Sequence, residues 1–207
     1  MGTVSLCAVR ALCLAICLSW AGAALAQDRP TIQDRYADKD KLLYANASVM
    51  THVRDDFYSS WGYGADVGFF LTQTLGLELR IVKLNTTLDD AAVDLKQRIG
   101  ITPDARPQRL WAQAGLRYAP GYGKMLMWES FVVHFDPQLV VHGGIAQADG
   151  RTLPSFNVAL SLLAHFRWGI KLKVDLGASI QSEARERGTV WTTGFVPLAG
   201  LGWGWQF

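Results

Sequence analysis

The chain has 207 residues, of which 50% are hydrophobic, and a formal net charge of +2. This length suits one domain with short appendages, and the nearly balanced charge argues against nucleic acid or an acidic partner. Beyond the first 26 residues, no run approaches the roughly 18 to 20 continuous apolar residues of a membrane-spanning helix.

Residues 1–26 have the pattern of a secretory signal peptide. Arg10 is their only charged residue, an apolar run follows it, and Ala24-Leu25-Ala26 fits the small-residue cleavage site. We expect cleavage before Gln27; an uncleaved membrane anchor is the alternative. All three cysteines lie within this segment, so we expect an exported mature chain without disulfides.

Residues 27–40 are charged and lack an apolar repeat, which predicts a flexible periplasmic lead-in with few contacts. From residue 41 to residue 207 the hydrophobic period is two. In the clearest stretch, 170–181, apolar residues alternate with polar or small ones. This period is typical of strands with one apolar face.

The alternation predicts eight strands. We place them at 42–50, 63–71, 75–83, 109–118, 129–146, 155–164, 170–181 and 191–207. Asp136-Pro137 interrupts the fifth, since proline cannot donate to a sheet ladder. We expect one long strand with a bulge at Pro137; the alternative, two strands, would give nine in all and put the termini on opposite sides.

The predicted connections alternate in length. Short turns are expected at 72–74, 119–124 and 165–169, and longer loops at 51–62, 84–108, 147–154 and 182–190. With both termini on one side, all short turns lie on that side. The longest loop has apolar residues at helical spacing from Leu88 to Leu95, which predicts a helix that ends at Gly100.

Alternation alone leaves two orientations open. A soluble lipocalin-like barrel would have its apolar faces inside, whereas a membrane barrel has them outside. Unequal loops favour the membrane barrel, as do aromatic residues near the strand ends, which are typical of membrane interfaces. These interface aromatics are Phe57, Tyr58, Trp61, Tyr63, Tyr118 and Trp168. We therefore predict an all-β fold, a closed antiparallel eight-stranded transmembrane β-barrel with short periplasmic turns and longer external loops.

The last residues of the chain alternate between large apolar residues and glycine or glutamine. In a closed barrel this last strand pairs with the first, and its aromatics face outer-membrane lipid. The pattern resembles the assembly signal that bacterial outer-membrane proteins present to the barrel-assembly machinery. Its residues here are Leu201, Trp203, Trp205 and Phe207.

Three segments resemble the outer-membrane β-barrel domain family common in myxobacteria and related Deltaproteobacteria. They are "LRYAPGYGKML", "FVVHFDPQLVVHGGIA" and "VDLGASIQ", together with an aromatic first loop, "RDDFYSSWGYG". Pro137 departs from the family pattern. The resemblance implies a barrel over about residues 41–207. Most members of that family have no assigned activity, and a few belong to envelope-spanning assemblies such as gliding machinery. The resemblance therefore implies either no activity or a role in such an assembly.

In the membrane orientation, the polar residues that alternate with apolar ones along each strand face the lumen. They are Asp66, Glu78, Arg80, Gln113, Arg117, His134, Asp136, His142, Lys171, Lys173 and Asp175. An eight-stranded barrel is filled by side chains, so we expect the charged ones to form a structural ion-pair network. The charged set is Asp66, Glu78, Arg80, Arg117, Asp136, Lys171, Lys173 and Asp175. A gated pore is the alternative.

The polar residues do not form a recognisable catalytic or metal-binding pattern. His134 and His142 are eight residues apart, about 27 Å along a strand, and we expect His52 in an external loop and His165 in a turn. No serine, histidine and carboxylate are spaced as a triad, and no metal-ligand spacing occurs. We expect no catalytic residues, no metal and no cofactor.

These observations predict a non-enzymatic integral protein of the bacterial outer membrane. We expect a structural, anchoring or adhesion-type component that binds another envelope protein or a surface ligand. The binding regions would be the external loops, chiefly 84–108 and 51–62, or the lead-in. The alternatives are a lipid-modifying enzyme such as a lipid A acyl-modifying enzyme, a small-solute channel, and a subunit of an envelope-spanning assembly.

Overall fold

The computed structural model describes residues 38–54, 58–100, 107–127, 131–148, 150–185 and 188–207. The predicted signal peptide and residues 27–37 of the lead-in lie outside them. The strands are β1 (Leu42–Arg54), β2 (Tyr58–Phe70), β3 (Leu75–Leu88), β4 (Gln108–Tyr118), β5 (Gly123–Met127), β6 (Phe131–Ala148), β7 (Arg151–His165), β8 (Ile170–Arg185) and β9 (Gly188–Gln206). One α-helix, α2 (Asp90–Ile99), and a short 3-10 helix, η1 (Arg167–Gly169), complete the described elements.

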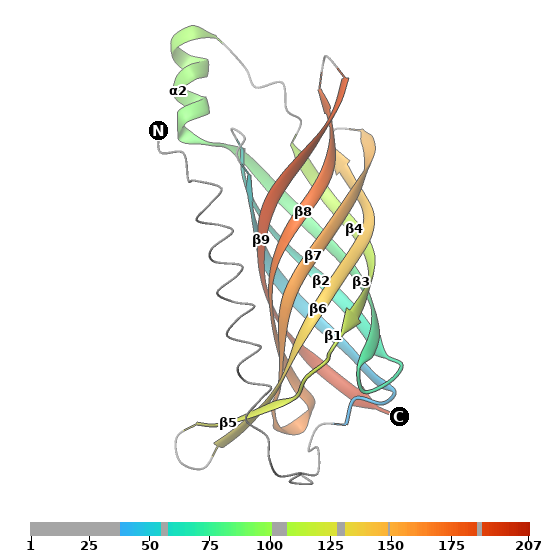
Figure 1. Ribbon diagram of the computed structural model, residues 1–207. Coiled ribbons are helices and arrows are strands. Elements are labelled where there is room, and N and C mark those ends of the chain that lie inside the picture. Colours follow the sequence, from blue (N-terminus) through green and yellow to red (C-terminus); the bar gives the residue numbers. More distant parts are fainter. Residues whose placement is uncertain (1–37, 55–57, 101–106, 128–130, 149, 186–187) are drawn as a thin grey trace, which may run out of the picture. The chain divides into compact units, whose positions relative to one another are not determined.

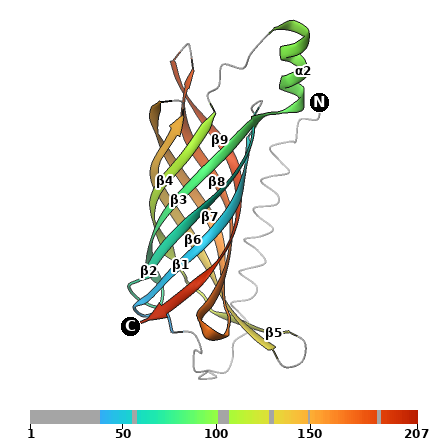
Figure 2. The same ribbon diagram turned by 180° about the vertical axis from the view of Figure 1, so that it is seen from behind.

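Eight of the strands close into an antiparallel barrel. The order around the sheet is β4-β3-β2-β1-β9-β8-β7-β6, and pairing between β4 and β6 joins its two ends. Leu42 at the start of β1 pairs with Gln206 at the end of β9. Figures 1 and 2 show these strands running obliquely around a common axis. The predicted eight-stranded barrel is confirmed, as is the pairing of its first and last strands.

β5 is a ninth strand that lies outside the barrel wall. It pairs only with Phe131–Phe135 of β6 and projects from the end of the barrel where β1 begins and β9 ends, called here the terminal end. The short turn predicted at 119–124 is therefore wrong, because this connection contains β5 and runs on to the start of β6. The alternation of β5 was too short to stand out from a turn.

The bulge predicted at Pro137 is also wrong, although the single long strand is confirmed. β6 pairs with β7 through Pro137 and Leu162 without a shift in register. On its other edge, β6 passes here from β5, which it leaves at Phe135, to β4, which it meets at Leu139. A residue without an N–H is tolerated best at such a break between two ladders.

At the opposite end, called here the α2 end, three of the four predicted long loops are short. Only residues 55–57, 149–150 and 186–187 separate the strands there. In β3, for example, the outward residues become polar at Asn85 and Thr87, yet Asn85 still pairs with Trp61 of β2. Strand pairing thus continues beyond the apolar part of the pattern, and the predicted strand ends came too early.

The fourth long connection contains α2, as predicted. Gly100 ends the helix in the left-handed conformation, φ +70°, and its N–H donates to the carbonyl of Lys96 at 3.1 Å. Asp90 in the first turn and Arg98 in the last suit the helix dipole. Among the described residues, no helix combines the length and apolarity needed to cross a membrane.

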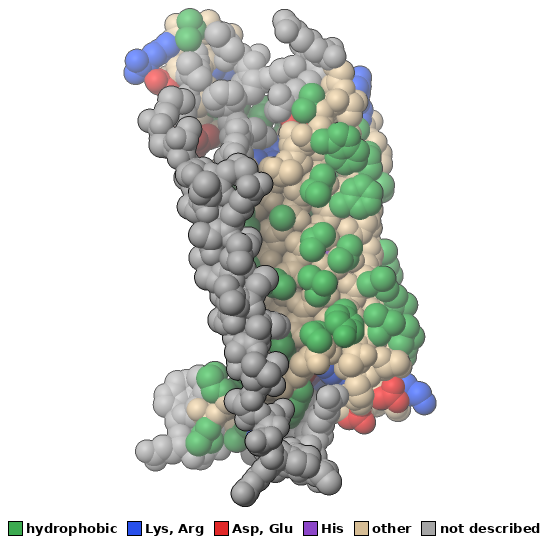
Figure 3. All heavy atoms as spheres, in the orientation of Figure 1, with side chains coloured by type: hydrophobic (Ala, Val, Ile, Leu, Met, Phe, Trp, Pro, Cys, Tyr) green, Lys and Arg blue, Asp and Glu red, His purple; other side chains and the backbone are tan. Residues whose placement is uncertain are grey.

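The apolar side chains of the barrel face outward and the charged ones face inward. In β3, Leu79 is 63% exposed, whereas Glu78 and Arg80 on either side of it are 1% and 2% exposed. Figure 3 shows hydrophobic side chains spread over the barrel wall, with acidic and basic side chains near the two ends. This is the reverse of a soluble barrel and matches the outward apolar band of membrane barrels.

Candidate functional site

Six charged side chains meet inside the lumen and form one ion-pair network, called here the central network. They come from β2, β3, β4 and β8, and comprise Asp66, Glu78, Asp175, Arg80, Arg117 and Lys173. Three are acidic and three basic, so the network is neutral. All six are almost completely buried. Such charges are tolerated only when each one is paired and hydrogen-bonded.

The two arginines connect opposite sides of the barrel. Arg80 Nε lies 3.0 Å from Asp66 Oδ1, and Arg80 Nη2 lies 3.0 Å from Glu78 Oε1 and 2.5 Å from Asp175 Oδ2. Arg117 pairs with Glu78 through Nη1 and with Asp175, at 3.5 Å, through Nη2. Since β3 and β4 face β8 across the lumen, these contacts link strands that are not neighbours in the sheet.

Uncharged groups complete the hydrogen bonding of the network. The Tyr44 hydroxyl donates to Glu78 Oε2 at 2.5 Å, and Arg117 Nε donates to Gln138 Oε1 at 2.7 Å. His142 Nε2 lies 3.0 Å from Glu78 Oε1. The sequence analysis did not include Tyr44 among the lumen residues. Its position two residues before Asn46 and four before Ser48 on β1 would have placed it on the same inward face.

Gly68 leaves the space that the Tyr44 ring occupies. A Cβ at this position would lie 2.1 Å from the ring, so we expect Gly68→Ala to destabilise the barrel by about 1–3 kcal/mol through overpacking. Chemical unfolding in lipid vesicles would measure the change. Gly143→Ala is the matched control, since its Cβ would lie at 3.5 Å from Phe156, an ordinary contact. Equal effects of the two substitutions would contradict this packing role.

The other two predicted lumen charges, Asp136 and Lys171, form a second cluster toward the terminal end. Asp136 Oδ2 lies 2.6 Å from His165 Nε2, and His165 Nδ1 lies 2.7 Å from Lys171 Nζ. Lys39 Nζ is 3.1 Å from Asp136 Oδ1. The sequence predicted one network, whereas the barrel is long enough to separate the charges into two.

Lys39 belongs to the predicted lead-in, which was expected to make few contacts. Its side chain is 1% exposed, and its N–H donates to Gln73 Oε1 at 3.2 Å. Gln73 also donates to the carboxylate of Asp38. Together with the N–H of Asp40, it holds the pKa of Asp38 below its usual value. The end of the lead-in is thus fixed to the turn between β2 and β3.

Two histidines lie inside the barrel and not in the predicted loop and turn. His165 is in β7, and His52 is in β1 because that strand runs further than expected. His52 Nε2 is 2.9 Å from Ser179 Oγ, and its ring packs edge-on against Trp111. Among the described contacts of His52 there is no carboxylate. The pair therefore lacks the third group that orients a catalytic histidine.

The remaining two histidines, His134 and His142, lie apart as expected. His134 Nδ1 contacts the hydroxyl of Tyr122, and His142 belongs to the central network. In the part of the chain that the structure describes, no group of His, Cys, Asp and Glu side chains is arranged to hold a metal ion.

An apolar layer lies on each side of the central network inside the lumen. The layer toward the α2 end consists of Met50, Val82, Leu84, Trp111, Ala146, Val196 and Leu198. The layer toward the terminal end consists of Leu42, Tyr44, Phe70, Ala119 and Leu163. The predicted polar lumen is therefore interrupted by apolar side chains, as on the inward face of β3, which changes from charged to apolar between Arg80 and Val82. Polar side chains such as His52 and Gln181 are buried again nearer the α2 end.

The predicted interface aromatics lie at both ends of the wall, apart from Phe57, which is outside the described residues. Trp61 and Tyr63 in β2 are exposed and Tyr58 is partly buried. Tyr118 in β4 and Trp168 in η1 are exposed nearer the terminal end, Trp168 at 77%. Trp61, Tyr63, Tyr118 and Trp168 thus reach the outer surface, where an aromatic ring can meet a membrane interface. Tyr58 instead falls at an inward position of β2, in line with the buried Ser60.

The residues of the predicted assembly signal lie on the outer surface of β9. Trp203 pairs with Ala45, and Trp205 pairs with Leu43 of β1. Leu201 is 60% exposed and Phe207 is 80% exposed. The strand is thus paired along both edges while its large side chains point away from the lumen.

Comparison with known proteins gives structural neighbours only. No family model and no curated protein match the chain. The N-terminal β-barrel domain of OprF from Pseudomonas aeruginosa is 15% identical and has a TM-score of 0.39, and it covers 80% of this chain and 98% of its own. Neisserial surface protein A (NspA) is 10% identical with a TM-score of 0.40, and it covers 80% of this chain and 96% of its own. Ail, the attachment invasion locus protein of Yersinia pestis, is 10% identical with a TM-score of 0.39, and it covers 80% and 99%.

Proposed function

We propose that this protein is a non-enzymatic barrel of the bacterial outer membrane that anchors or docks an envelope partner at its α2 end. The observation that carries the proposal is the combination of an apolar wall with a lumen that a buried ion-pair network and two apolar layers cross. The wall provides surface for lipid, and the paired charges and apolar layers occupy the interior where a channel or a reaction centre would lie. Recognition is therefore assigned to the ends of the barrel.

The connection 89–107 is the surface best suited to a partner. α2 lies within it beyond the strand pairing, since the last pair between β3 and β4 is Lys83 with Leu110. Val93 is 37% exposed and Ile99 is 62% exposed on the helix. An exposed pair between Asp94 and Arg98, at 2.7 Å, lies between them. Apolar side chains among charged ones are typical of protein recognition surfaces.

The proposal includes a route for export and insertion. We propose that residues 1–26 direct export and that the barrel-assembly machinery recognises β9. The backbone of this strand at Trp203 and Trp205 pairs with β1 only once the barrel has closed. Before closure it is available to another protein.

Replacing residues 89–107 by a short Gly-Ser linker tests the docking role. We expect the barrel to fold, because this connection lies outside the strand pairing, and we expect capture of an envelope protein from gently solubilised membranes to fall at least tenfold. The matched control carries the same linker at Gly150, which lies in the tight connection between β6 and β7 at the same end. Unchanged capture by the first variant, or equal loss in both, would refute docking through α2.

A further inference from the structure

The pairing between β1 and β9 is interrupted on the half of the wall toward the α2 end. Met50 pairs with Leu198, and the next pair is Val53 with Phe195. The register is the same on both sides of the gap, so Thr51 lies opposite Pro197 without ladder pairing. Proline has no N–H to donate. On its other edge, β9 stays paired with β8, where Leu176 lies opposite Pro197.

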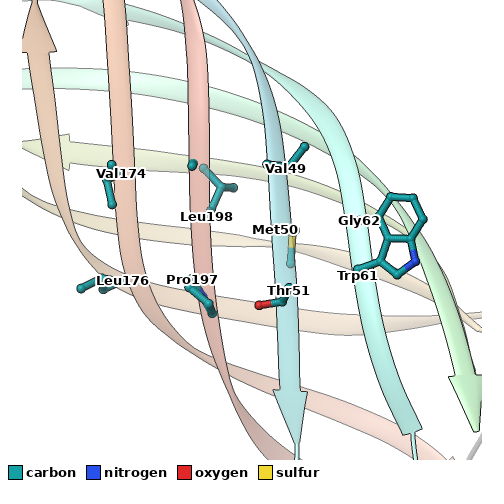
Figure 4. Close-up of a pocket in the computed structure, with 10 residues that line it drawn as sticks. Val49, Met50, Thr51, Trp61, Gly62, Val174, Leu176, Pro197 and Leu198 are labelled. Atoms are coloured by element: carbon teal, nitrogen blue, oxygen red, sulfur yellow. The ribbon is translucent and has the colours of Figure 1, made fainter. Parts of the chain in front are cut away.

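A groove of about 390 Å³ lies on the outer wall at this interruption. Figure 4 shows its lining side chains, which come from four strands, with Pro197 and Thr51 side by side between Leu176 on one side and Trp61 on the other. Val49 and Ala199 also line it. Val49, Trp61 and Leu176 are each more than half exposed, so the groove opens on the outward face.

The chemistry of the lining selects an apolar and flexible occupant. None of the ten lining residues is charged, and Thr51 carries the one side-chain hydroxyl among the described residues that line the groove. A polar or charged ligand would lose its hydration there without gaining partners. The inner ends of the groove are closed by Met50 and Leu198, which belong to the apolar layer of the lumen. An occupant would therefore lie along the wall without entering the barrel.

We propose that the groove binds one acyl chain of a bilayer lipid in preference to the rest of the wall. The inference rests on the membrane location proposed above, because the wall that carries the groove is then covered by lipid. The interrupted ladder creates a depression that a chain fills, with contacts from Trp61 and Leu176 on its sides and Pro197 beneath it. Flat parts of the wall offer contact from one side only.

The test is photo-crosslinking in lipid vesicles that contain a phospholipid with a diazirine in its acyl chain. The chain is already surrounded by apolar lipid tails, so its gain in the groove is extra dispersion contact, and about ten additional carbon–carbon contacts correspond to a preference of roughly fivefold. We expect adducts at Val49, Trp61 and Leu176 to exceed by this factor those at Leu79 and Leu160, which are equally exposed elsewhere on the wall. This comparison needs no substitution.

Two variants test the cause of the preference. Ala199→Leu fills the groove, and Pro197→Val restores the N–H and favours closure of the ladder; both are expected to remove the preference. The matched controls are Ala114→Leu in β4 and Pro154→Val in β7, which are exposed wall positions outside the groove lining. They are expected to leave the preference unchanged.

Several outcomes would overturn the proposal, and they can be told apart. If the adduct yield at each residue depends only on how exposed that residue is, on every side of the barrel, the groove is refuted as a site while the membrane location is supported. Fewer adducts at the groove than on the rest of the wall would show that the acyl chain is kept out of the groove, and would refute the groove as a lipid site. An absence of adducts on the whole wall would refute the membrane location, and the groove proposal with it.

Discussion

Replacing Leu79 by arginine is expected to destabilise the barrel by about 2–4 kcal/mol, the cost of a basic side chain in the middle of a lipid-facing wall. Leu79 is 63% exposed and lies within the outward apolar run of β3 from Leu75 to Ile81, between the inward Glu78 and Arg80. An exposed position on a soluble protein would tolerate the same change within about 0.5 kcal/mol. Reversible chemical unfolding in lipid vesicles would measure the difference.

Thr87→Arg provides the control for this substitution. Thr87 lies on the same strand, eight residues further toward the α2 end, and is also exposed. Near the membrane interface an arginine costs about 0–1 kcal/mol. Similar small effects at both positions would show that the wall of β3 faces water, and the membrane location would then be wrong.

Replacing Arg117 by methionine is expected to destabilise the protein by about 3–5 kcal/mol, because it leaves buried carboxylates without their partner. Arg117 is 0% exposed and pairs with Glu78 and Asp175. It also donates to Gln138 and Ser161. Methionine keeps most of the side-chain volume, so the measured change reports the loss of charge and hydrogen bonds.

The control for this change is Arg98→Met on α2. Arg98 pairs with Asp94 on the surface, where an ion pair contributes about 0–1 kcal/mol. A second comparison uses Glu78→Gln together with Arg117→Met, which we expect to cost less than the sum of the single changes because the two residues are in direct contact. Additive costs, or a small effect of Arg117→Met alone, would contradict a tightly coupled network.

The fold followed from the sequence because each strand has its own alternating pattern. Glu78 and Arg80 could be placed on the inward face from their neighbours alone, since Leu77, Leu79 and Ile81 set the outward face. The ends of the strands could not be placed in this way. At Asn85 and Thr87 the outward residues become polar while the backbone pairing goes on, so periodicity stops before the ladder does.

The contacts across the lumen could not be predicted from the pattern of single strands. Alternation gives the face on which a residue lies, but the height at which two opposite side chains meet depends on the stagger between strands around the barrel. Asp136 and Lys171 consequently joined Lys39 and His165 and not the central network. Tyr44 was overlooked for a related reason, because a tyrosine near the end of a strand is equally typical of the interface.

The joining of the first strand to the last has a consequence for biogenesis. Closure requires β9, so no shorter nascent fragment can complete the cylinder, and contacts between segments so distant in sequence form late. Until then β1 and β8 each retain an open edge beside a hydrophobic surface, a combination prone to self-association in water. With the membrane location proposed above, we expect the polypeptide to need the protection of a chaperone until it reaches the bilayer.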